Sequence, residues 1–96
     1  MNLEELLTIV HQRNASDLHI STGLPPVIRI DGKLIRTDYP PMTNDEIQKL
    51  VFSILNNEQR RNLEQHWELD CSYGFKDMGR FRVNVYKEKG NYAAAF

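Results

Sequence analysis

The chain has 96 residues, of which 41% are hydrophobic and 26% are charged, and its formal net charge is −1. This length and composition predict one folded domain with a modest core, and the balanced charge argues against general binding to nucleic acid. The single cysteine excludes an internal disulfide. No signal peptide and no apolar run of roughly 18 residues is present, so we expect a cytoplasmic chain without direct membrane insertion.

Residues 2–14 predict an amphipathic helix. Apolar residues recur at the spacing that places side chains on one helix face, and Asn2 is a suitable N-cap residue. The apolar residues are Leu3, Leu6, Leu7 and Val10.

Residues 16–22 predict a strand, because apolar and polar residues alternate. Leu18 and Ile20 fall on one face, and Asp17 and His19 fall on the other. A polar face of this kind is the normal state of a half-buried antiparallel strand. The strand ends at Gly23, which is followed by two prolines.

A hairpin and two helices follow. Asp31 and Gly32 form a tight-turn sequence between strands predicted at 27–30 and 33–36. Thr43 and Glu46 have the spacing of a capping box before a helical apolar pattern, and Asn56 with Gln59 repeats that signature. The second signature predicts a short third helix, supported by an apolar pair four residues apart, Leu63 and Trp67.

Three strands end the chain. Residues 68–75 and 80–89 alternate with a period of two, and the sequence DMG at 77–79 predicts a turn between them. A second turn at 89–91 leads to the apolar strand 92–96. We expect this last strand to lie exposed at a sheet edge, which predicts a monomer or a weak, strand-exchanged dimer. Because the sequence stops on an apolar residue, we also expect 1–96 to be a fragment of a longer protein.

The order of elements predicts an α+β domain, with an antiparallel sheet and helices packed on one side.

Three common kinds of functional site are not expected from this sequence. A phosphate-binding loop is not expected around Gly32 and Lys33. Val27 stands where such a loop needs its first glycine, and Leu34 stands where it needs serine or threonine. No metal site is expected, because the three histidines, His11, His19 and His66, lack metal-ligand spacing. A nucleophilic cysteine is not expected either. Cys71 has no second cysteine nearby, and we expect it to be a small core residue.

Two arginines on the strand 80–89 form the one candidate anion site. Arg80 and Arg82 project from the same face about 7 Å apart, and their planar guanidinium groups suit a phosphate or carboxylate. The alternative is that both are solvated, or that they pair with an acidic side chain, of which the candidates are Asp17, Asp31 and Asp70.

Four short motifs, in order, carry a resemblance to a known family: SDLH at 16–19, GLPP at 23–26, RIDG at 29–32 and GRFRVN at 79–84. Together they resemble the amino-terminal domain of the twitching-motility ATPases, within the type II/type IV secretion ATPase family. The resemblance implies a PAS-like domain of a homohexamer that drives pilus retraction. It implies ATP and Mg bound in the parent protein, and partners among the neighbouring subunits and the pilus machinery of the inner membrane.

The catalytic motifs of that family belong to a second, RecA-like domain, and none is in this chain. The resemblance therefore implies no catalytic residue and no cofactor for the fragment itself. It implies that Arg82 and Arg80 approach the nucleotide phosphates in the parent. Asp17, His19 and Asp31 are expected in interface or orienting roles. The alternative functions are a free-standing PAS-like ligand sensor and a protein-interaction module.

Overall fold

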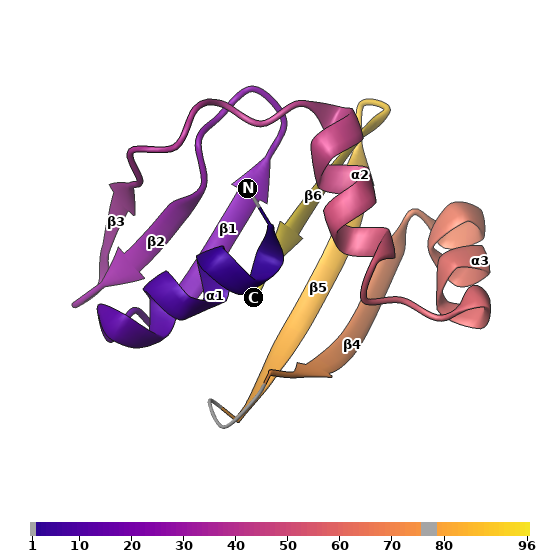
Figure 1. The fold of residues 1–96 in the computed structure, drawn as a ribbon. Helices are drawn as coiled ribbons and strands as arrows, with labels where there is room; N and C mark the ends of the chain where they lie inside the picture. The colour runs from indigo at the N-terminus through magenta and orange to yellow at the C-terminus, as the bar shows by residue number, and fades with distance from the viewer. Residues whose placement is uncertain (1, 76–78) are drawn as a thin grey trace.

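The computed structural model of the chain describes residues 2–75 and 79–96. Within these ranges the elements follow the predicted order, helix, three strands, two helices, three strands (Figure 1). The helices are α1 (Leu3–Gln12), α2 (Asn44–Phe52) and α3 (Asn57–His66). The strands are β1 (Asp17–Ser21), β2 (Val27–Ile30), β3 (Lys33–Arg36), β4 (Glu68–Gly74), β5 (Arg80–Glu88) and β6 (Asn91–Ala95).

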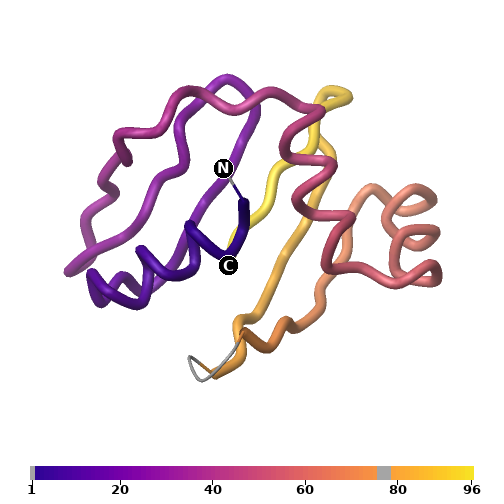
Figure 2. Tube along the Cα trace, in the orientation of Figure 1, coloured from indigo at the N-terminus to yellow at the C-terminus, as the bar shows by residue number. Residues whose placement is uncertain are grey.

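All six strands form one antiparallel sheet in the order β3-β2-β1-β6-β5-β4. The last strand, β6, lies in the centre of the sheet between β1 and β5, where the yellow end of the chain can be followed in Figure 2. Ala94 is paired with Ile20 on one side and with Val85 on the other. The expectation of an exposed last strand was therefore wrong, and the sheet edges are formed by β3 and β4.

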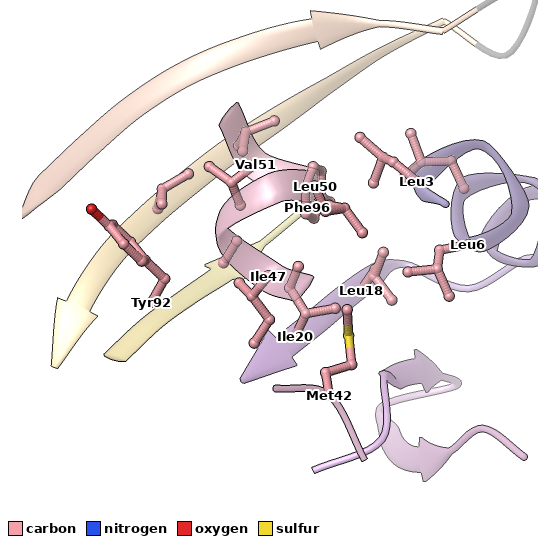
Figure 3. Packing of buried hydrophobic residues seen from close by; sticks show 14 of the residues in the cluster. Leu3, Leu6, Leu18, Ile20, Met42, Ile47, Leu50, Val51, Tyr92 and Phe96 are labelled. Carbon is pink, nitrogen blue, oxygen red and sulfur yellow. The ribbon is translucent and has the colours of Figure 1, made fainter. Parts of the chain in front are cut away.

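The core lies on one face of the sheet, under α1 and α2, as the α+β prediction requires. Figure 3 shows Ile47, Leu50 and Val51 of α2 gathered with Leu18 and Ile20 of β1. All buried residues of the described ranges are hydrophobic apart from a proline in the loop before β2, and none is charged. Burying apolar side chains from both layers is the main favourable contribution to folding. Among the described residues, no helix covers the opposite face of the sheet, which we call the open face (Figure 1).

The predicted helix starts are confirmed. The side chain of Asn2 accepts a hydrogen bond from the backbone N–H of Glu5 at 2.9 Å. The capping boxes that begin α2 and α3 are both complete. Such caps satisfy backbone donors that the first turn of a helix leaves unpaired.

Two local predictions turned out differently or lie outside the description. Trp67 lies just after α3, which ends at His66, and not within the helix. It ends the helix in a left-handed conformation with φ of 60°, and it is 61% exposed. The start of the helix is capped, and its Leu63 is fully buried in the core. The turn predicted at 77–79 lies partly outside the described residues.

The position of β6 leads to a test with neighbouring alanines. Ala94 is only 2% exposed and faces the helices, whereas Ala95 is half-buried on the open face. We expect Ala94→Leu to lower the free energy of unfolding by about 1–3 kcal/mol, because the extra atoms overpack the core. Ala95→Leu is the matched control, with an expected change within about 0.5 kcal/mol. Urea titration of both variants measures the difference, and equal effects would contradict a central β6.

Candidate functional site

The open face of the sheet carries the polar residues that the sequence singled out. In an antiparallel pair, directly opposed residues point to the same face. The register pairs His19 with Ala95, Ala95 with Asn84, and Asn84 with Asp70, across four neighbouring strands. Residues two positions away along each strand share this face. Asp17 on β1 and Arg82 on β5 therefore lie on the open face, as do His19 and Arg80.

Asp17 is the centre of a first group of open-face residues, the β1 cluster, formed by Ser16, Asp17, His19 and Arg29. The Asp17 carboxylate accepts a hydrogen bond from the Ser16 hydroxyl and contacts Nε2 of His19. Nε of Arg29 lies 3.3 Å from the same carboxylate, and its NH1 donates to the carbonyl oxygen of Gly32 at 3.1 Å. The Ser16 hydrogen bond, with those from His19 and Arg29, lowers the pKa of Asp17.

Arg82 and Arg80 belong to a second group, the β5 cluster, completed by Asp70 and Ser72 of β4. Nε and NH2 of Arg82 donate to the two carboxylate oxygens of Asp70, at 3.3 and 2.7 Å. NH2 of Arg80 donates to the Ser72 hydroxyl at 2.8 Å. The hydrogen bond from Arg82 lowers the pKa of Asp70, and the same bond raises the pKa of Arg82.

The two clusters lie on the same face of the sheet, but none of the hydrogen bonds described above joins one cluster to the other. One strand, β6, separates β1 from β5, so their backbones lie about 10 Å apart. Asp31 belongs to neither cluster. It lies exposed in the turn between β2 and β3, where φ is 50° for Asp31 and 80° for Gly32. Positive φ at both positions is what a type I′ hairpin turn requires.

The sequence interpretation missed Arg29 and Ser72 as members of these clusters. Both lie directly across from a residue that was singled out, since Asp17 is paired with Arg29, and Ser72 with Arg82. The tight β2–β3 turn fixes how β2 pairs with β3, but not how β1 pairs with β2. A longer loop joins β1 to β2, so the sequence does not predict that Asp17 lies opposite Arg29. Of the three acidic candidates for pairing with Arg82, the structure shows Asp70.

Cys71 is half-buried and packs against the core, as predicted for a small core residue. Burial raises the pKa of its thiol, so the reactive thiolate form is disfavoured. The three histidines lie on separate elements: His11 on α1, His19 on β1 and His66 on α3.

No protein-family model matches the chain. Its full length is 38% identical to the type IV pilus retraction ATPase PilT of Pseudomonas aeruginosa, of which it covers 28%. It is also 35% identical, over 71 residues, to a twitching motility protein of Neisseria gonorrhoeae. That match covers 74% of this chain and 19% of the relative.

Two solved structures have the same fold. The pilus retraction motor PilT with bound ADP matches with a TM-score of 0.91 and 36% identity, over 99% of this chain and 28% of that chain. The chain is similar in both sequence and fold to a PilT-type amino-terminal domain. The ATPase DotB of Legionella pneumophila matches with a TM-score of 0.81 and 26% identity, over 97% of this chain and 27% of that chain. The chain thus spans little more than a quarter of the length of these relatives.

The domain carries these polar side chains on a surface rather than in a cavity of the core. The side chain of Arg82 is 85% exposed, and that of Asp70 is 47% exposed. In the β1 cluster, the side chain of Asp17 is more enclosed, at 26%. The helices in the described ranges are too short and too polar for any of them to cross a membrane. The open face therefore offers charged groups to whatever packs against it, and the Arg82 side chain among them is largely exposed.

The β1 cluster predicts an acid-sensitive contribution to the stability of the domain. The pKa of Asp17 is lower in the folded domain than in the unfolded chain, so its contribution is present above about pH 4 and is lost as the pH falls below that value. We expect Asp17→Asn to lower the free energy of unfolding at pH 7 by about 0.5–1 kcal/mol, since the site is partly exposed. At pH 3 the difference should shrink.

Urea titrations at pH 7 and pH 3 provide the measurement. Asp38→Asn is the control, because Asp38 is an exposed loop carboxylate outside both clusters. A constant difference between Asp17→Asn and the parent at both pH values would rule out the charge of Asp17 as the source of the effect.

Proposed function

We propose that the chain is the amino-terminal assembly and regulatory domain of a hexameric ATPase that powers type IV pilus retraction. One observation carries this proposal: the whole chain matches a pilus retraction ATPase at 38% identity and the PilT structure at a TM-score of 0.91. In this proposal a RecA-like second domain holds ATP and Mg. The ring works in the cytoplasm, at the inner-membrane face, where it contacts the pilus machinery.

Arg82, and with it Arg80, is proposed to contact the nucleotide phosphates at the boundary with the second domain. Three properties support this role. The Arg82 side chain is 85% exposed, it projects from a long strand of the sheet, and its partner Asp70 is itself exposed. Ion pairs in such a position contribute little to stability, so the guanidinium is available to a second anion. Arginine also suits phosphate better than lysine, because its planar fork can donate two parallel hydrogen bonds.

The first test replaces Arg82 in the full-length hexameric protein. We expect Arg82→Ala to lower the rate of ATP hydrolysis by at least about tenfold, because a guanidinium beside the transferring phosphate offsets charge in the transition state. Arg82→Lys should recover only part of the rate, since an ammonium group lacks the bidentate fork. The measurements are turnover, nucleotide affinity and the oligomeric state by light scattering.

A matched control uses another arginine of the same domain. Arg61 lies exposed on α3, away from the β5 cluster, and Arg61→Ala should hydrolyse ATP at the parental rate. If both Arg82 variants form intact hexamers and also keep the parental rate, then Arg82 has no role at the phosphates.

A second test concerns the 96-residue chain alone. It lacks the glycine-rich loop and the Mg-binding residues that phosphoryl transfer needs. We expect no measurable hydrolysis and no tight nucleotide binding when ATP and Mg are titrated into it by calorimetry. Binding at micromolar concentration would place the nucleotide site within this domain and contradict the proposal that the second domain holds the nucleotide.

A further inference from the structure

Three alternate residues of β4, namely Asp70, Ser72 and Gly74, face the two arginines of β5 on the open face. The register places Ser72 directly opposite Arg82, and Gly74 directly opposite Arg80. Each guanidinium nevertheless bonds to the β4 residue two positions earlier, Arg82 to Asp70 and Arg80 to Ser72. Both side chains therefore lean in the same direction, toward the beginning of β4. We call these three β4 residues the arginine cradle.

Gly74 supplies space in the arginine cradle. A Cβ atom built at Gly74 would lie 3.4 Å from NH1 of Arg80 and so would just touch it. Gly74 is not in the left-handed region that favours glycine, so its backbone alone does not require that residue. The absence of a side chain there leaves room for the Arg80 guanidinium to lie over β4. A branched side chain at position 74 would occupy that room.

Asp70 holds only one edge of the Arg82 guanidinium. Its two oxygens accept from Nε and NH2, which form the side of the planar group. Among the residues that the structure describes, NH1 of Arg82 has no hydrogen-bond partner. The end of the group, formed by NH1 and the second hydrogen of NH2, is thus open to a second anion. A side-on carboxylate and an end-on phosphate can bind one guanidinium at the same time.

We propose that Asp70 is a positioning residue that fixes the direction of Arg82 toward the nucleotide phosphates, with Ser72 and Gly74 doing the same for Arg80. This inference rests on the proposed function. A guanidinium already held at one edge loses less freedom when it meets the phosphate, and its charge is aimed before the reaction begins. Asp70 acts through Arg82 and does not touch the nucleotide.

A double-mutant cycle in the full-length hexamer tests the proposal, with Asp70→Asn, Arg82→Ala and the double variant. Asp70→Asn keeps the size of the side chain but removes its charge. We expect it to lower kcat by about three- to tenfold with little change in the KM for ATP, because positioning acts on the transition state. In the Arg82→Ala background, the same substitution should have no further effect.

The controls separate positioning from folding. Asp38→Asn, outside the cluster, should leave kcat unchanged, and Asp70→Glu should recover part of the lost rate. Thermal melting and light scattering verify that each variant is folded and hexameric. Gly74→Val extends the test to Arg80: it should lower kcat in the parent but not in the Arg80→Ala background.

Each contrary result has its own meaning. If Arg82→Ala lowers turnover but Asp70→Asn does not, the positioning role is wrong and the proposed function stands. If Asp70→Asn costs as much in the Arg82→Ala background as in the parent, then Asp70 acts independently of the arginine, and the inference fails. An increase in nucleotide affinity or kcat in Asp70→Asn would make Asp70 a competitor of phosphate, which also overturns it. If Arg82→Ala keeps the parental rate in intact hexamers, the proposed role of Arg82 at the phosphates fails, and the inference that rests on it falls as well.

Discussion

The insertion of β6 between β1 and β5 is the constraint on which the rest of the structure depends. β6 closes the sheet with backbone hydrogen bonds on both sides, continued at the end of the chain by Leu18 and Phe96, which bond each other at 3.0 and 2.8 Å. The side chain of Asn44 accepts from the backbone N–H of Tyr92, which ties β6 to the start of α2. Without β6 the sheet would be divided into the three strands β3-β2-β1 and the hairpin β5-β4, and an isolated two-stranded hairpin is marginally stable at best.

The same insertion places the two polar clusters on one surface at a fixed separation. The alanine side chains of β6 project little from the middle of the open face, and larger side chains of β1 and β5 lie on either side of them. On the opposite face Ala94 allows α2 to pack closely over the sheet. One short strand of small residues therefore serves the core on one side and spaces the charged groups on the other.

How much of this was predictable depends on whether the interaction is local. The caps at Asn2, Thr43 and Asn56, and the turn at Asp31, depend on residues three or fewer positions apart, and the sequence predicts them. The position of β6 depends on which strand edges are free to pair with it, and one of its partners, β1, is distant in the chain. Its run of alanines shows no alternation of apolar and polar residues, so the sequence does not indicate which face of β6 is buried. The sequence therefore predicted the existence of the last strand but not its position.

The candidate site shows the same division. Alternation along β5 predicted that Arg80 and Arg82 share an exposed face. The choice of Asp70 as the partner of Arg82 was left open, because it requires the register of β4 against β5 and the direction in which the side chains lean. The residues that complete the two clusters, Arg29 and Ser72, are visible only once strands are paired.

The pairing of Arg82 with Asp70 bears on how the two interpretations of the arginines relate. The sequence leaves them as alternatives, a structural ion pair or a contact with phosphate. The observed geometry is compatible with both, because the carboxylate bonds to the Nε edge of the guanidinium and the side chain is 85% exposed. An ion pair this exposed adds little to the stability of the fold. Its main physical consequence is to restrict the orientation of a long, otherwise mobile side chain. That orientation gains a use only when an anion approaches the open face from outside the domain.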